Sequence, residues 1–379
     1  MLTLRGPKGV RRGAALRDLG IIEDGSVLIR DGVVVEVGST RRIENLKEAR
    51  AAIEIPANGR IISPGFVDAN LSLSLYHPHQ PHKPSKRKSM GDFYDSCLAL
   101  LRSCLQHGTL TADVKASAAH LDPHLSLSMI RKLAEIGTNP IFTVRTWHLG
   151  TGEGQSESEL IAVLAVMVKR KLIRFIEFTH RSDSSIESQL AAVVADSEVG
   201  VKLAWPGGNT EELYQCLHLF NPLAVYCLAP SSLNSAEIAM LATALSTSVL
   251  AVGRGVFEGH ISRVGRNLID AGAAIALSSG YDSESAASYS MQMSLALAVF
   301  RLGLTPEEAF SAATINGAYA AGRGETTGSL EVGKQADVLL LNVPDYREVP
   351  SQFGVNHVDM ALRDGNIVLN RTRWKAMHN

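Results

Sequence analysis

The feature that most constrains the fold is an alternation, through the middle of the chain, of short β-rich runs with longer segments of helical periodicity. The runs with the length and apolar character of strands are Ile62–Asp68, Leu110–Lys115, Ile141–Trp147, Ile173–Thr179, Val199–Trp205, Leu223–Leu228, Ser248–Val252 and Ala274–Ser279. The helical segments between them include Phe93–Gln106, Leu125–Ile136, Glu157–Lys171, Glu187–Ala195, Thr210–Phe220, Ser235–Leu245 and Ile261–Ala271. Eight strands with intervening helices predict an α/β fold built on a closed, parallel (β/α)₈ TIM-type barrel.

An open doubly wound sheet is the alternative arrangement of the same elements. It is disfavoured because no glycine-rich phosphate loop follows the first strand. The glycine-rich segment 150–154 lacks the G-x-G-x-x-G spacing and is interpreted as a flexible loop. Two further helices are expected at about Ser288–Arg301 and Thr305–Ala321, the second beginning with a threonine cap followed by proline and glutamate.

Both ends of the chain have the pattern of β-hairpins. Near the start, two largely apolar runs flank Asp31-Gly32, a dipeptide typical of two-residue hairpin turns. Near the end, a strand-like run precedes a second pair of runs around Asp364-Gly365. We therefore predict a small β-sandwich domain formed by residues 1–61 and 325–379, with the barrel domain, residues 62–324, inserted between them.

Composition excludes some classes of partner and compartment. The net charge is −1 and the pI about 6.9, which gives no electrostatic preference for nucleic acid or an anionic membrane. No apolar run reaches the roughly 18 residues that span a bilayer, and the first residues lack the apolar core of a signal peptide. The four cysteines are scattered, which favours reduced thiols in a cytoplasmic protein.

Several segments carry a resemblance to one family. Ile62–Asp68 is similar to the "PGFID" segment that opens the amidohydrolase barrel, and Gly108–Lys115 resembles the "GTTTVEIK" strand of that superfamily. Gly328–Asp337 nearly matches the segment that returns from the barrel to the β domain. Gln352–Asn356, "QFGVN", resembles the tail of imidazolonepropionases. From about Arg12 to Val368, the chain thus resembles an amidohydrolase of the imidazolonepropionase type.

This resemblance implies a metal-dependent hydrolase that opens the C–N bond of a cyclic amide, a non-peptide bond. In such enzymes zinc or iron converts bound water into a nucleophile near neutral pH. The resemblance places the metal ligands as two histidines after the first barrel strand, one after the fifth, often one after the sixth, and an aspartate after the eighth. Here the corresponding residues are Asn70, Ser72, Ala204, Leu228 and Gly280.

These replacements predict that the family metal site is absent and that the chain has no metal cofactor. Amide and hydroxyl oxygens are weak neutral ligands, poorly suited to zinc or iron. Losing only an outer-shell partner costs about 10–100-fold in metal affinity, and here the ligands themselves are replaced. The lost aspartate is also the expected base for the attacking water. His77, His79 and His82 could form a displaced metal site, but the prolines among them favour a plain loop.

Other polar residues at strand ends are candidates for chemistry. Lys202 and Asp113 are expected to place opposite charges inside the barrel mouth, either as a structural pair or with the lysine as nucleophile or base. Glu177 and His180 end the fourth strand, either as an acid–base pair or as polar rim residues. The candidates for ligand binding are Asp113, His148 and Arg254, the last either contacting a ligand carboxylate or pairing with neighbours.

Two functions remain open. The first is an imidazolonepropionase-like homologue that is catalytically impaired and binds a small molecule or partner protein, a pseudoenzyme. The second is an active hydrolase of a cyclic amide or related C–N bond that uses an atypical site. A homodimer is implied only by the resemblance.

Overall fold

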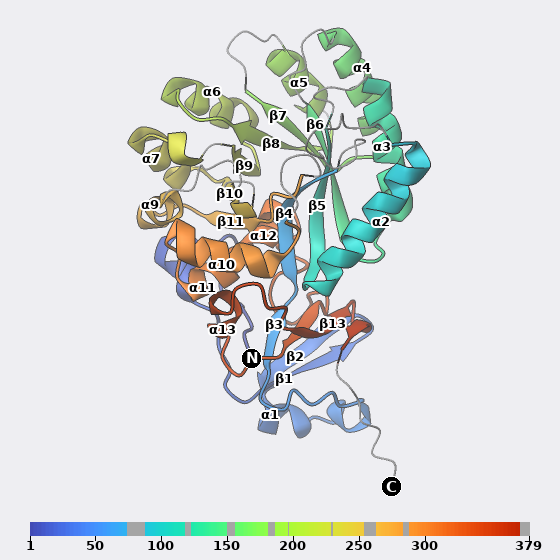
Figure 1. Cartoon of the computed structure of the whole chain (residues 1–379), viewed down its shortest axis with the longest axis vertical. Coiled ribbons are helices and arrows are strands. Elements are labelled where there is room, and N and C mark those ends of the chain that lie inside the picture. The colour runs from blue at the N-terminus through green and yellow to red at the C-terminus, as the bar shows by residue number, and fades with distance from the viewer. Residues whose placement is uncertain are drawn as a thin grey trace.

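The structure is a computed structural model that describes residues 1–73, 88–117, 123–149, 156–180, 186–195, 197–228, 230–253, 263–282 and 288–371. It consists of a barrel above two small sheets (Figure 1). Arg254, the three histidines at 77–82 and the glycine-rich segment 150–154 lie outside the described residues.

The predicted barrel is confirmed. Its eight strands are hydrogen-bonded to their neighbours in chain order, and every pairing is parallel. The strands are β4 (Phe66–Leu73), β5 (Thr109–Ser117), β6 (Phe142–Leu149), β7 (Phe175–Thr179), β8 (Gly200–Trp205), β9 (Ala224–Cys227), β10 (Thr247–Ala251) and β11 (Ile275–Ser278).

Individual hydrogen bonds close the seam between the first and last barrel strands. The backbone N–H of Ser72 donates to the carbonyl of Tyr281 at 2.8 Å. The backbone N–H and hydroxyl of Ser279 both donate to the carboxylate of Asp68, the N–H at 3.1 Å. A buried side chain thus closes the barrel where the backbone ladder is incomplete.

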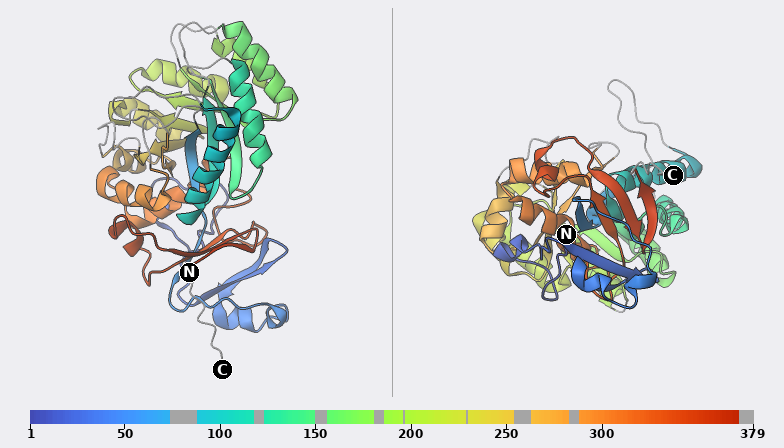
Figure 2. Two further views of the ribbon diagram at one scale, coloured as in Figure 1. Left: turned by 45° about the vertical axis from the view of Figure 1, so that its right-hand side comes forward. Right: turned by 90° about the horizontal axis from the view of Figure 1, so that it is seen from below.

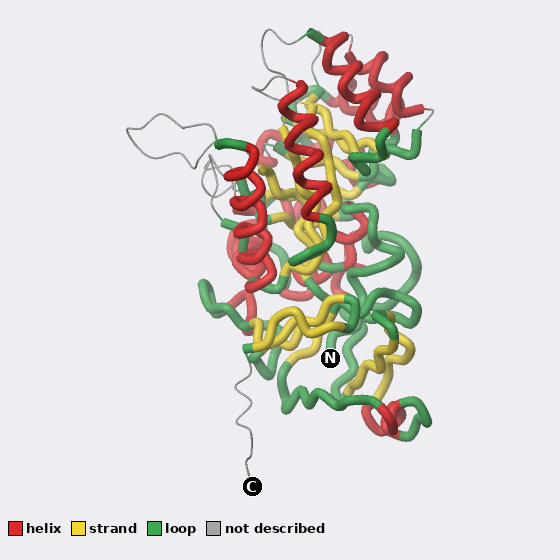
Figure 3. Tube along the Cα trace, turned by 90° about the vertical axis from the view of Figure 1, so that its right-hand side faces the viewer, coloured by secondary structure: helices red, strands yellow, loops and turns green. Residues whose placement is uncertain are grey.

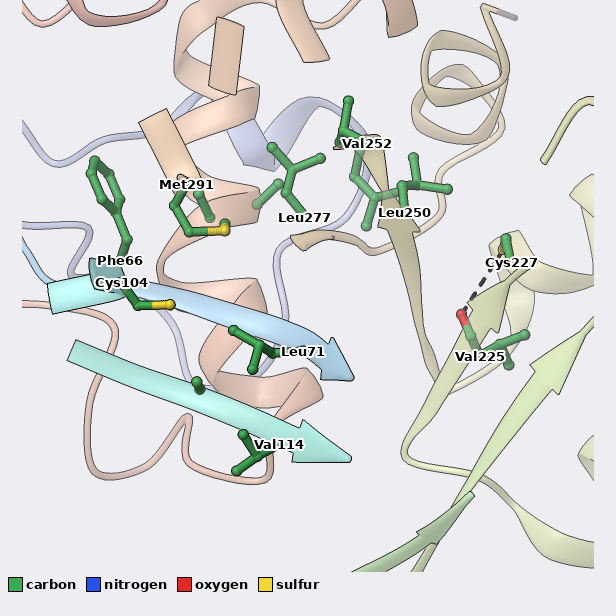
Figure 4. Close-up of a cluster of buried hydrophobic side chains, with 14 of the residues drawn as sticks. Phe66, Leu71, Cys104, Val114, Val225, Cys227, Leu250, Val252, Leu277 and Met291 are labelled. Atoms are coloured by element: carbon green, nitrogen blue, oxygen red, sulfur yellow. Dashed lines mark hydrogen bonds between the residues drawn. The ribbon is translucent and has the colours of Figure 1, made fainter. Parts of the chain in front are cut away.

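Helices surround the barrel and bury its outer face (Figures 1 and 3). They are α2 (Met90–Gln106), α3 (Pro123–Ile136), α4 (Glu157–Lys169), α5 (Ile186–Ala195), α6 (Thr210–Phe220), α7 (Ser235–Thr243), α9 (Val264–Asp270) and α10 (Met291–Leu302). Apolar side chains fill the layer between strands and helices, among them Phe66, Leu71, Leu277 and Met291 (Figure 4). This continuous apolar layer fixes the strands that carry the inward-facing polar residues.

The two terminal segments form the predicted β-sandwich below the barrel (Figure 2). One sheet pairs β1 (Gly25–Arg30) with β2 (Val33–Ser39), and the other has the order β14 (Asn366–Asn370), β13 (Val358–Arg363), β12 (Val338–Leu341), β3 (Ile61–Pro64). Both hairpins turn through an Asp-Gly pair with positive φ at each residue, as their sequence predicts. A separate apolar core that includes Val34, Leu340 and Met360 lies between the sheets.

Two predicted elements are each divided in the structure. The run expected as one first strand splits into β3, in the terminal sheet, and β4, in the barrel, with Gly65 between them. The helix expected over Thr305–Ala321 is two helices, α11 (Pro306–Ala313) and α12 (Ile315–Ala320). They separate at Thr314, whose φ of −126° and ψ of −92° are not helical.

The described residues also form several smaller elements. They are η1 (Gly13–Arg17), α1 (Thr40–Glu44), η2 (Ala49–Ala51), η3 (Pro230–Ser232) and α13 (Glu348–Ser351). None of the helices in the described ranges is long and apolar enough to cross a membrane. All four cysteines are buried and free.

Candidate active site in the barrel

Polar side chains of four adjacent strands meet inside the barrel. His148 on β6, Glu177 on β7 and Lys202 on β8 are direct neighbours in the strand register. Asp113 and Lys115 lie two residues apart on β5 and therefore share one face of that strand. Charged groups from separate parts of the sequence are thus brought into one buried cluster.

Glu177 is held by two partners. Its Oε2 accepts a short hydrogen bond from Nζ of Lys115, and its Oε1 lies 2.9 Å from Nδ1 of His148. The Lys115 and Glu177 side chains are only 4% and 3% exposed, whereas His148 is 19% exposed. Nζ of Lys115 also lies 4.4 Å from the ring centroid of Tyr226. His148 is therefore the most accessible member of this group.

A second ion pair joins Lys202 to Asp113. Their Nζ and Oδ2 atoms are 2.5 Å apart, and the side chains are 3% and 0% exposed. Thr146 donates its hydroxyl to the other carboxylate oxygen at 2.5 Å, and Nζ of Lys202 lies 4.2 Å from the ring centroid of Phe175. The structure thus brings together the two residues expected to place opposite charges in the barrel.

The pKa values of two interior carboxylates, Glu177 and Asp68, are shifted in opposite directions. Burial alone would raise the pKa of Glu177, but Lys115 and His148 outweigh it and lower that pKa to about 2. Burial raises the pKa of Asp68 to about 6, although Ser279 and the N–H of Asn70 donate hydrogen bonds to its carboxylate. The ionised form is therefore strongly favoured at Glu177 and disfavoured at Asp68, although both side chains line the same barrel.

The structure does not bring Glu177 and His180 together as an acid–base pair. Side chains alternate between the two faces of a strand, so residues three apart point to opposite sides. Glu177 contacts the interior residues Lys115 and His148. His180, just beyond β7, instead lies outside the strands against Glu187, Cys216 and the ring of Trp205.

Comparison with known proteins relates this chain to a family. Residues 182–368 match the model of the amidohydrolase family. This match and the relatives that follow support the amidohydrolase superfamily for this chain. The imidazolonepropionase of Alkaliphilus metalliredigens is 27% identical over 98% of this chain and 97% of its own length, and that of Parabacteroides distasonis is 28% identical over 97% of each. The solved guanine deaminase of E. coli superposes with a TM-score of 0.68 at 14% identity, covers 98% of this chain and 97% of its own, and supports the fold alone.

In this chain, the positions expected for metal ligands carry few donors. Asn70 is buried, and its Nδ2 has no hydrogen-bond partner among the described residues. The backbone N–H of Ser72 makes the hydrogen bond to Tyr281 that closes the barrel. Ala204 packs in a small apolar cluster with Tyr226. Gly280 has no side chain, and the hydroxyl of the adjacent Ser279 is donated to Asp68. Asn70, Ser72, Ala204, Leu228 and Gly280 therefore present one amide and one hydroxyl, with no imidazole or carboxylate.

Lys115 is the site residue that sequence reasoning missed. Its signal was its spacing from Asp113, because two charged residues two apart on a buried strand point into the same interior. Tyr226 had no comparable signal, since one aromatic residue in an apolar run is typical of any core strand. Arg254 lies outside the described residues and stays a prediction.

Proposed function

We propose that this chain is an imidazolonepropionase-like amidohydrolase homologue that lacks the family metal site and binds a small molecule in its barrel without turning it over at the family's rates. The observation that carries the proposal is the pair of buried ion pairs, Lys115–Glu177 and Lys202–Asp113. The carboxylates of Glu177 and Asp113, which could attract a cation, each already face an ammonium group.

Electrostatics and ligand chemistry support this reading together. At an effective dielectric constant of about 20, unit charges 4 Å apart interact by about 4 kcal/mol, so a cation that drew either carboxylate from its lysine would forfeit an attraction of this order. The residues at the family's ligand positions are weak neutral donors for zinc or iron. Since function depends on the site and not on the fold, superfamily membership leaves the reaction open.

The ligand would enter beside His148. Its imidazole is the most accessible group of the cluster, and Glu177 fixes it through Nδ1, which leaves Nε2 for a ligand. We include Arg254 as a predicted ligand contact. The proposal also places the protein in the cytoplasm, on the basis of its scattered cysteines, and allows a homodimer, which only the resemblance implies.

The test combines turnover with binding. Purified protein is assayed for hydrolysis of imidazolone propionate with added zinc or iron, and for binding of imidazolone propionate by calorimetry. We expect no turnover, and binding that His148→Ala weakens at least tenfold. Metal-dependent hydrolysis that Asn70→Ala or Ser72→Ala abolishes would overturn the proposal.

A second candidate function is hydrolysis of a cyclic amide through an atypical, metal-independent site. It is favoured by the 2.9 Å contact between Glu177 and His148, because a carboxylate that orients an imidazole is a common general-base arrangement. In that case chelator-resistant hydrolysis would be measurable. It would be lost in His148→Ala, Glu177→Ala and Lys202→Ala, whereas the exposed variant Glu198→Gln would retain it.

A further inference from the structure

A second polar cluster lies outside the barrel, where β7 ends between α5 and α6. We propose that His180, Glu187 and Cys216 form a binding site for a zinc-like transition-metal ion. Nδ1 of His180 lies 2.8 Å from Oε1 of Glu187 and 3.3 Å from Sγ of Cys216. Within the described part of the chain, this is the one group of three or more His, Cys, Asp or Glu residues whose ligand atoms all lie within 4.8 Å of one another.

The first argument is that Glu187 and Cys216 both lie against the same nitrogen, Nδ1 of His180. Nδ1 of a neutral imidazole carries either a proton or a lone pair, so it can satisfy the carboxylate of Glu187 or the thiol of Cys216, but not both. A metal ion between the three atoms would bind all of them. Zinc is typically bound tetrahedrally at about 2.0–2.3 Å from N, O and S ligands, so Nδ1 of His180 would need to move away from the Glu187 oxygen and the Cys216 sulfur by only roughly 0.2–0.6 Å.

Glu212 supplies the second argument. Its Oε2 lies 3.1 Å from Nε2 of His180, the ring nitrogen opposite the cluster. As placed, that contact is not aligned as a hydrogen bond, and Nε2 is buried without one. Histidines that bind metals usually donate their other N–H to a carboxylate. Metal binding at Nδ1 would fix the proton on Nε2, where Glu212 can accept it after a small rotation.

Burial and charge suit a cation. Cys216 is 2% exposed, and the side chains of His180 and Glu187 are 10% and 17% exposed, so the cluster is shielded yet reachable. Burial, with Glu187 and Glu212 nearby, raises the pKa of Cys216 to about 12. The thiol is therefore protonated in the metal-free protein. As the metal–sulfur bond forms, the S–H proton passes to solvent, and one proton is released per metal bound.

The site would join α5 and α6 to the end of β7. Glu187 lies in the first turn of α5, Cys216 lies in α6, and His180 follows β7, so one ion would cross-link three elements. With three protein ligands, the fourth position would hold water. The alternative is a metal-free cluster in which a protonated imidazole lies between two carboxylates.

Cobalt(II) titration of the full chain separates these possibilities, because a cobalt–thiolate bond gives a near-ultraviolet charge-transfer absorption. The background protein carries His77→Asn, His79→Asn and His82→Asn, which removes the other histidine cluster of the sequence. We expect one equivalent of cobalt with this absorption, and release of about one proton. Cys216→Ala should abolish the absorption and weaken binding by more than about 100-fold, beyond the effect of losing an outer-shell partner.

One matched control and a second ligand variant keep the test decisive. Cys227→Ala removes a buried cysteine outside the cluster and should bind cobalt like the background protein. Glu187→Gln changes a partly exposed ligand, so it tests the site if Cys216→Ala does not fold. Zinc should raise the unfolding temperature of the background protein but not of either ligand variant. No thiolate absorption, or equal zinc stabilisation in Glu187→Gln, would overturn the proposal. The readouts need no turnover, so they stand apart from the function proposed for the barrel.

Discussion

Glu177 is the residue on which the polar interior of the barrel depends most. Changing Glu177→Gln keeps its shape but removes the negative charge that Lys115 faces. Breaking a buried ion pair from one side costs about 3–5 kcal/mol, and we expect that loss in the free energy of unfolding measured with urea. The exposed pair Lys171–Glu198 provides the control, because Glu198→Gln at an exposed pair should change stability little. Equal effects of the two substitutions would mean that the buried pair is not formed.

The same carboxylate predicts a dependence of stability on acid. Its folded-state pKa, about 2, is below the ordinary value of 4.5, so the unfolded chain binds the proton more tightly. Its contribution is therefore complete above about pH 4.5 and is lost as the pH falls towards 2, amounting to about 3 kcal/mol. Unfolding measured across this range should show the loss in the native chain. In Glu177→Gln this part of the pH dependence should be missing, and an unchanged profile would contradict the assignment.

How far the sequence predicts these residues depends on strand geometry. Lys202 and Asp113 could be placed together because both lie on apolar runs that must face a common interior. The acid–base hypothesis paired His180 with Glu177. The alternation of side chains along β7 instead turns His180 away from Glu177. Its actual neighbours, Glu187 and Cys216, come from helices whose rotation no strand pattern fixes.

At the scale of elements, periodicity predicted the barrel strands and most helices closely, but not where one continuous run must divide. Gly65 marks such a place between β3 and β4. A Cβ atom there would lie 2.6 Å from Cδ1 and 2.8 Å from Cβ of Leu110. The division therefore depends on the contact with a neighbouring strand, which the run itself does not reveal.

Substituting Gly65→Ala should consequently destabilise the protein. The added methyl group would push against the backbone-proximal atoms of Leu110, and overpacking of this kind costs about 1–3 kcal/mol. Gly91→Ala, near the start of α2, is the matched control, because its new methyl group would meet only Ser89 Oγ, at 3.7 Å. That control should be neutral or stabilising by up to about 1 kcal/mol. Thermal unfolding distinguishes the two, and a neutral Gly65→Ala would show that β3 and β4 can shift apart freely.

At the scale of the whole molecule, the barrel and the sandwich of both termini follow from the sequence, whereas their attachment does not. The division into residues 1–61 with 325–379 and 62–324 stays a prediction. One buried side chain links the amino-terminal segment to the barrel: Asn316 in α12 accepts the N–H of Arg11 and donates to the carbonyls of Arg11 and Ile275, each at 2.8 Å. No sequence pattern indicates that Asn316 joins these distant parts, because its partners are brought to it only by the fold.

Asn316→Ala should loosen this attachment. It would leave three backbone groups at a buried site without their partner, and each unsatisfied buried group costs about 1–3 kcal/mol. We expect a loss of at least about 3 kcal/mol in urea unfolding, together with faster amide exchange at Arg11, whose N–H is then unprotected. Asn366→Ala removes an exposed asparagine that donates only to Asp364 and should leave both quantities nearly unchanged. If amide exchange at Arg11 stayed slow in Asn316→Ala, the amino-terminal segment would be held to the barrel by its other contacts, such as the hydrogen bond from Gly13 N–H to the carbonyl of Ala273.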